Sequence, residues 1–137
     1  ETNKMPNLTI TNVDLGNVIL KDGEFRDDLL TFAGAATVLE GTILARDSGT
    51  LKLVPFVKGG VTNENGVPKA VVTYDVVAAG AGDESIRDMV SGSVRAERLI
   101  IDADGDGSNV DAAVLDQLRD YSLISIDVQE LNILDNQ

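Results

Sequence analysis

The chain has 137 residues, a formal net charge of −12 at pH 7, and neither histidine nor cysteine. That length suffices for one domain with its own core, while the missing residue types exclude disulfides, thiolate catalysis and histidine-based acid–base or metal chemistry. The negative charge disfavours binding to nucleic acid or anionic lipid, and no apolar run is long enough to span a bilayer. We therefore expect a structural or binding module rather than an enzyme, with no cofactor, no nucleic-acid partner and no membrane association.

Residues 1–16 are predicted to lie ahead of a single compact domain, which would comprise residues 17–137. The lead contains Pro6 and shows no periodicity, so we expect it to be flexible. The segment from Leu8 to Val13 is β-prone, with an interrupted alternation of apolar and polar residues. Two structures fit this segment, an extended arm or an ordinary first strand.

Two turn signals follow. Residues 18–33 contain Asp22-Gly23 between two apolar groups, which predicts a short hairpin or a loop. Residues 34–57 show the strongest hairpin pattern, because two apolar runs flank the polar turn Asp47-Ser48-Gly49-Thr50. In this turn we expect the Asp47 side chain to bond to the backbone and Gly49 to take a positive φ.

The middle of the chain alternates loops with strand-like segments. Residues 58–68 hold three glycines, two asparagines and a proline, which predicts an exposed loop. Residues 70–77 (AVVTYDVV) are rich in β-branched side chains and predict a buried strand, which the AAGAG run at 78–82 ends. Residues 94–101 (VRAERLII) fit either a strand or a short helical turn, and the sequence does not decide between them.

The acidic run Asp102-Ala103-Asp104-Gly105-Asp106-Gly107 matches the opening of an EF-hand calcium loop. It places carboxylates at positions one, three and five and glycine at position six, as a calcium site built from oxygen ligands requires. Position twelve is Ala113, where the motif needs a bidentate glutamate. Asp102, Asp104 and Asp106 are therefore weak candidates for metal ligands. The alternative is a solvated acidic turn before a helix, where negative charge suits the helix dipole.

A helix is predicted next, with Ser108 or Asn109 as its N-cap, Asp111 in its first turn, and apolar residues at helical spacing up to Tyr121. The segment from Leu123 to Val128 then resumes strand character and is expected to pair into the sheet. Three apolar residues of the tail are expected to cover a neighbour or a partner subunit: Leu131, Ile133 and Leu134. The predicted fold is β-rich α+β, a small mixed sheet and hairpin domain with one C-terminal helix and an extended N-terminal arm.

This order of elements resembles the head decoration proteins of lambda-type tailed phages. The resemblance covers roughly residues 34–128. Within the run SGSVRAERLII at 91–101, its most specific part is the glycine followed by an alternation of hydrophobic and charged residues from Gly92 to Leu99, together with the closing strand SLISI at 122–126. The acidic insertion at 102–106 and the longer tail after Val128 depart from the lambda protein.

The resemblance implies a structural, non-enzymatic protein that binds as a homotrimer to the major capsid protein at three-fold positions of the head. It also implies a place on the outer capsid surface of the virion, after assembly in the host cytoplasm. In this family the amino-terminal arm engages the shell, a role that carries over here to Leu8, Thr9, Ile10, Thr11 and Val13. An extended arm can add main-chain hydrogen bonds to a sheet edge.

The competing interpretation is a calcium-dependent binding module that uses the Asp102–Asp106 loop.

Overall fold

Two long antiparallel strands, β1 (Ile19–Phe32) and β7 (Gly82–Arg95), frame the fold in the computed structural model, which describes residues 18–126. The predicted hairpin or loop at residues 18–33 is wrong, because β1 continues through Asp22-Gly23 without reversing. The pairing register between β1 and β7 shifts at these residues. The turn residues therefore produce a bulge, as glycine within a strand often does.

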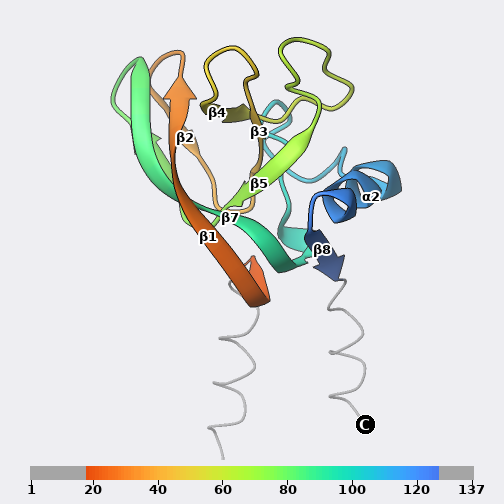
Figure 1. The fold of residues 1–137 in the computed structure, drawn as a ribbon. Helices are drawn as coiled ribbons and strands as arrows, with labels where there is room; N and C mark the ends of the chain where they lie inside the picture. Colours follow the sequence, from red (N-terminus) through yellow and green to blue (C-terminus); the bar gives the residue numbers. More distant parts are fainter. Residues whose placement is uncertain (1–17, 127–137) are drawn as a thin grey trace, which may run out of the picture.

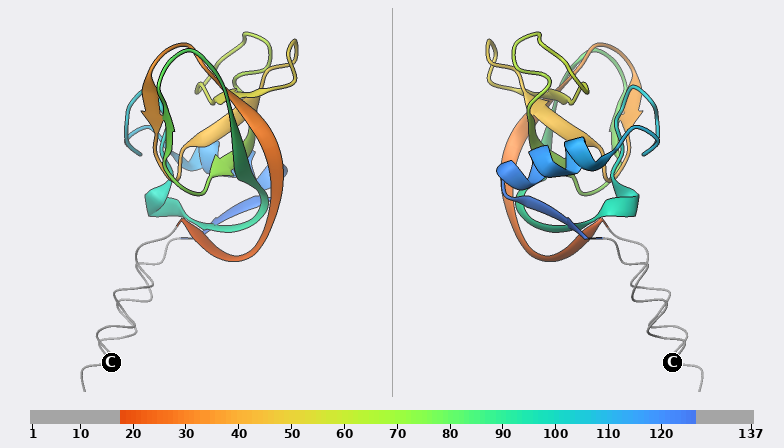
Figure 2. Two further views of the ribbon diagram at one scale, coloured as in Figure 1. Left: turned by 90° about the vertical axis from the view of Figure 1, so that its left-hand side faces the viewer. Right: turned by 90° about the vertical axis from the view of Figure 1, so that its right-hand side faces the viewer.

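Three shorter strands complete a closed barrel: β3 (Ile43–Arg46), β4 (Leu53–Pro55) and β5 (Pro68–Val72). The strand order is β1-β4-β3-β5-β7-β8, and the additional pairing of β1 with β7 closes the ring (Figures 1 and 2). The pairs β1–β4 and β7–β8 are parallel and the others are antiparallel. The predicted small mixed sheet is thus confirmed.

The hairpin predicted at residues 34–57 is confirmed in its central part, where β3 pairs with β4. The Asp47 side chain behaves as expected, since its Oδ1 accepts hydrogen bonds from the amides of Gly49 (2.7 Å) and Thr50 (3.0 Å). The positive φ lies at Leu51 (64°) instead of at Gly49. The Leu51 amide donates to the carbonyl oxygen of Asp47 at 2.7 Å, which holds this conformation in place.

The strand predicted at residues 70–77 is split into two. Its first half belongs to β5, whereas β6 (Val76–Ala78) leaves the barrel and pairs with β2 (Ala36–Val38) in a separate two-stranded sheet. After β7 the chain turns through a short 3₁₀ helix, η2 (Ala96–Arg98). The segment 94–101 is therefore the end of a strand followed by a helical turn.

The predicted helix and closing strand are confirmed as α2 (Ala112–Asp120) and β8 (Leu123–Ile126). The predicted N-cap is wrong, because Asp111 occupies that position and its Oδ1 accepts from the Val114 amide at 3.1 Å. The reason is local: Asp106 Oδ1 accepts from the Ser108 amide at 2.9 Å, which extends the acidic turn past Ser108 before the helix begins.

The buried core has two parts. One contains Phe56, Met89 and Leu99 together with Leu118 of α2 and Leu123 of β8. The other fills the barrel around Leu30, Leu44 and Leu53. Burial of apolar area in these two clusters is the main term that favours this fold. Among residues 18–126, no helix has the length and apolar character needed to cross a membrane.

The candidate arm residues Leu8 to Val13, the proposed boundary at residue 16, and the apolar tail residues 131–134 lie outside the described residues.

Candidate functional site

The first and last described residues lie together at one end of the barrel. The carbonyl oxygen of Val18 accepts from the Arg95 amide at 2.8 Å. On the other edge of β7, Arg95 is opposite Ile126 in the parallel pair with β8. We call this end, formed by Val18, Arg95 and Ile126, the terminal pole (Figure 1). Any segment before Val18 or after Ile126 starts from this one face.

Val18, the residue before β1, is held in place by burial and by a hydrogen bond. Val18 is fully buried, and its amide donates to Glu40 Oε2 at 3.0 Å. Ile19 then pairs with Val94 across β7. Val18 and Ile19 are therefore fixed points of the domain.

Beside the terminal pole, β8 forms the outer edge of the described sheet. It pairs only with β7 within residues 18–126, so its second backbone edge has no strand partner there. Two of its side chains are exposed, Ile124 at 49% and Ile126 at 39%. A short edge strand with exposed apolar side chains is a surface on which another chain can pack.

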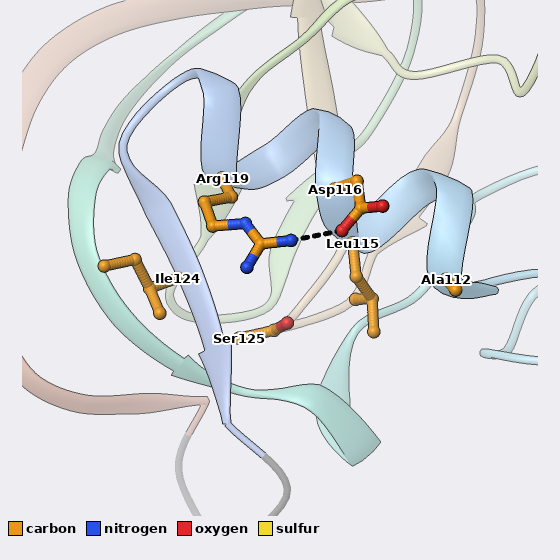
Figure 3. A pocket seen from close by; sticks show the side chains of 6 residues that line it. All are labelled: Ala112, Leu115, Asp116, Arg119, Ile124 and Ser125. Atoms are coloured by element: carbon orange, nitrogen blue, oxygen red, sulfur yellow. Dashed lines mark hydrogen bonds and ion pairs between the residues drawn. The ribbon is translucent and has the colours of Figure 1, made fainter.

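A hollow of about 220 Å³ lies between α2 and β8. Figure 3 shows Leu115 and the Asp116–Arg119 ion pair extending from α2 towards β8. The residues that line the hollow are Ala112, Leu115, Asp116, Arg119, Ile124 and Ser125. Together with the free edge of β8, this hollow forms what we call the α2–β8 groove.

The opposite end of the barrel carries the long loops (Figure 1). The predicted loop at 58–68 is confirmed, and it is tied to the β3–β4 turn because the Ser48 amide donates to the Asn63 carbonyl oxygen at 3.0 Å. The amide of Val57, the residue just before this loop, donates to the carbonyl oxygen of Asn65 at 2.9 Å. We call this end the loop pole.

Two carboxylates of the acidic loop accept hydrogen bonds from residues of the same turn. Asp104 Oδ2 accepts from Asn109 Nδ2 at 2.9 Å, and the backbone and side-chain hydrogen bonds of Ser108 lower the pKa of Asp106. Asp111 is the helix cap and also bonds to Lys58 Nζ at 2.6 Å. Within residues 18–126 no three acidic side chains lie close enough to hold a metal ion. The described geometry therefore favours a solvated turn at Asp102, Asp104 and Asp106.

The double variant Asp104→Asn/Asp106→Asn tests this interpretation. Its free energy of unfolding should differ from that of the wild type by less than about 0.5 kcal/mol, because both side chains are exposed. Thermal melting is compared with calcium and with a chelator. A midpoint that calcium raises for the wild type and leaves unchanged for the variant would support the calcium-binding alternative.

Sequence reasoning missed the α2–β8 groove and a buried pair of acidic residues, Asp28 and Asp88. The groove had one usable signal, since Ile124 and Ile126 alternate with polar residues in a strand that follows a helix directly. The carboxyl pair had a weaker one, because Asp88 stands between Ile86 and Val90 in the alternation of residues along its strand.

The closed barrel, the single described α-helix and the parallel closing strand define a small β-rich module. The family model described as bacteriophage lambda head decoration protein D matches residues 9–123. The match covers most of the chain, so the chain belongs to this family of phage head decoration proteins. It is a family of structural capsid proteins and not of enzymes. A search of curated proteins found no match.

The match starts earlier than the resemblance seen in the sequence. It includes residues 9–33, which comprise the second half of the candidate arm (residues 1–16) and all of β1, and it ends at Leu123, the first residue of β8.

Proposed function

We propose that this protein is a cement protein, which binds as a homotrimer to the major capsid protein on the outer surface of an expanded phage head and stabilises the shell. The observation that carries the proposal is the family match over residues 9–123. The geometry of the terminal pole supports it, because a segment that begins at the buried Val18 is anchored to the domain and can still reach a neighbouring surface.

The arm is proposed to supply the contacts with the shell. Its β-prone segment is suited to pairing with an exposed strand edge, where main-chain hydrogen bonds give affinity and alternate side chains give specificity. The proposed contact residues are Leu8, Thr9, Ile10, Thr11 and Val13. Expansion of the head would create the strand edge to which they bind, so that binding follows maturation.

The terminal pole is proposed to face the shell, with the loop pole directed outwards. The α2–β8 groove then lies where contacts with the capsid or with another copy of the chain are made. Many copies that each contribute a modest contact would stabilise a large shell, which requires no enzymatic chemistry.

A pair of matched variants tests this orientation. Ile124→Glu at the groove should weaken binding to expanded heads by about tenfold or more, because a charge would be buried in the contact. Val61→Glu at the loop pole, where the side chain is 94% exposed, should bind like the wild type. Binding is measured by co-sedimentation with heads, and circular dichroism checks that both variants are folded.

Light scattering on the same proteins tests the oligomeric state. The wild type and Val61→Glu should be trimers at the concentrations used for head binding. A monomeric Ile124→Glu would place the groove between subunits, whereas a trimeric Ile124→Glu with weak head binding would place it against the shell. Equal head binding by both variants would contradict the proposed orientation, and a monomeric wild type would contradict the trimer.

A further inference from the structure

Two carboxyl groups meet inside the barrel. Asp88 of β7 is fully buried and is paired in register with Arg26 of β1 on one side and Val72 of β5 on the other. Asp28 of β1 lies within hydrogen-bonding reach of Asp88, and its side chain is 8% exposed. Since β7 is bonded to both β1 and β5 here, the pair lies at a junction of three barrel strands.

Asp28 is held in its ionised form by two arginines. Arg46 of β3 donates from Nη1 to Asp28 Oδ1 at 3.2 Å and from Nη2 to Oδ2 at 3.4 Å. Arg26 Nη2 lies 3.7 Å from Asp28 Oδ1. Burial acts to raise the pKa of Asp28, but the hydrogen bonds and charges around it outweigh burial and lower this pKa below its ordinary value.

Asp88 lacks comparable partners. Both of its carboxylate oxygens are buried, and neither accepts a hydrogen bond. An ionised carboxylate buried in this way is costly, and a second carboxylate beside it adds repulsion. A proton on Asp88 removes both problems, because its hydroxyl can then donate to Asp28. Burial first, and then the Asp28 carboxylate, raise the pKa of Asp88 to about 7.

The positive charge of Arg46 on β3 also acts on Asp88 and lowers its pKa, but this effect is smaller than those of burial and of Asp28. On β5 the residue opposite Asp88 is Val72, and the Lys69 Nζ of that strand lies over the Tyr121 ring, 4.5 Å from its centroid. Asp28 also lines a surface hollow of about 290 Å³, which gives the pair a path to solvent for proton exchange.

We propose that Asp28 and Asp88 form a proton-binding pair that makes the closure of the barrel depend on pH. With one proton shared between them, the junction of β1, β7 and β5 is closed. When both carboxyl groups ionise, repulsion between them loosens the junction. This pH dependence does not rest on the proposed decoration role. The quantity that it changes is the free energy of unfolding of the barrel.

The direction of the effect follows from proton linkage. The folded chain keeps a proton on Asp88 up to about pH 7, whereas the unfolded chain releases it above about pH 4. Stability is therefore lost as pH rises between these values and levels off above the folded pKa. The chain has no histidine, and the pKa of Asp28 is lowered, so neither histidine nor Asp28 contributes to the slope in this window.

Denaturant unfolding at a series of pH values tests the proposal. Between about pH 5 and about pH 7 the unfolding constant of the wild type should rise by up to tenfold per pH unit, the slope for one proton. Asp88→Asn should remove this slope, because the Asn amide donates to Asp28 as the protonated acid does. The matched control is Asp27→Asn on β1, next to Asp28, where the Asp27 side chain is 77% exposed; it should keep the wild-type slope.

Carboxyl NMR titration of the folded wild type gives an independent measurement. One aspartate should titrate near neutral pH, and its resonance should be missing from Asp88→Asn. Amide exchange in β1 and β7, corrected for the intrinsic pH dependence, should speed up through the same range in the wild type only. A flat wild-type profile, an unchanged slope in Asp88→Asn, or titration of every aspartate below about pH 5 would overturn the proposal. If Asp88→Asn does not fold, the wild-type titration still decides.

Discussion

Deletion of residues 1–13 is expected to weaken binding to expanded heads by about a hundredfold or more, with the melting midpoint and the proposed trimer nearly unchanged. The loss corresponds to about three main-chain hydrogen bonds to a shell strand at roughly 1 kcal/mol each. Stability should be kept because the domain is fixed from Val18 onwards by burial and by the bond to Glu40. Co-sedimentation and thermal melting measure the two effects separately.

A matched control replaces residues 1–13 by a glycine and serine linker of the same length. It should bind heads as weakly as the deletion, because the proposed contacts need the β-prone sequence from Leu8 to Val13 and not only a tether. Equal head binding by the deletion and the wild type would exclude the arm from the contact. A collapse of the melting midpoint would show instead that the segment is an integral first strand.

The substitution Gly41→Ala should destabilise the domain by about 3–5 kcal/mol, the sum of a steric overlap and a strained backbone. Gly41 has a φ of 95°, and a Cβ there would lie 2.0 Å from the carbonyl oxygen of Arg98. The Gly41 amide donates to Val72 and its carbonyl oxygen accepts from Ile100. The backbone around Gly41 is thus bonded on two sides and has little room to move.

Two other glycines separate the contributions to this effect. Gly34→Ala meets no atom within 4 Å and has an ordinary φ, so it should change stability by less than about 0.5 kcal/mol. Gly105→Ala also has open space, but its φ is 74°, so only the backbone strain of about 1–2 kcal/mol should appear. Denaturant unfolding of the three variants gives the comparison. A Gly41→Ala variant no less stable than Gly105→Ala would contradict the close approach to Arg98.

The parts of the fold that depend on neighbouring residues were accessible from the sequence. The turn at Asp47 and the helix with its closing strand are fixed by side chains that bond or pack within a few positions. The path of β1 was not accessible, because Asp22-Gly23 is a good turn locally and only the long partner β7 keeps the strand extended. The split between β5 and β6 has the same cause, since β6 leaves the barrel to pair with β2.

The candidate site, too, could be predicted from the sequence only in part. The arm residues are a sequence prediction that falls outside the described region, and the family match includes residues from position 9 onwards. The calcium motif is visible in the sequence, whereas the hydrogen bonds that Asp104 and Asp106 accept within their own turn are seen only in the structure. The burial of Asp88 could not be predicted, since it depends on three strands that are distant in the sequence.

Co-sedimentation of the wild-type protein with expanded and unexpanded heads of the same phage tests the central claim most directly. We expect saturable binding to expanded heads, little binding to unexpanded heads, and a higher melting midpoint for the heads that carry the protein. Absence of binding to expanded heads, at concentrations where the protein is folded, would contradict the claim.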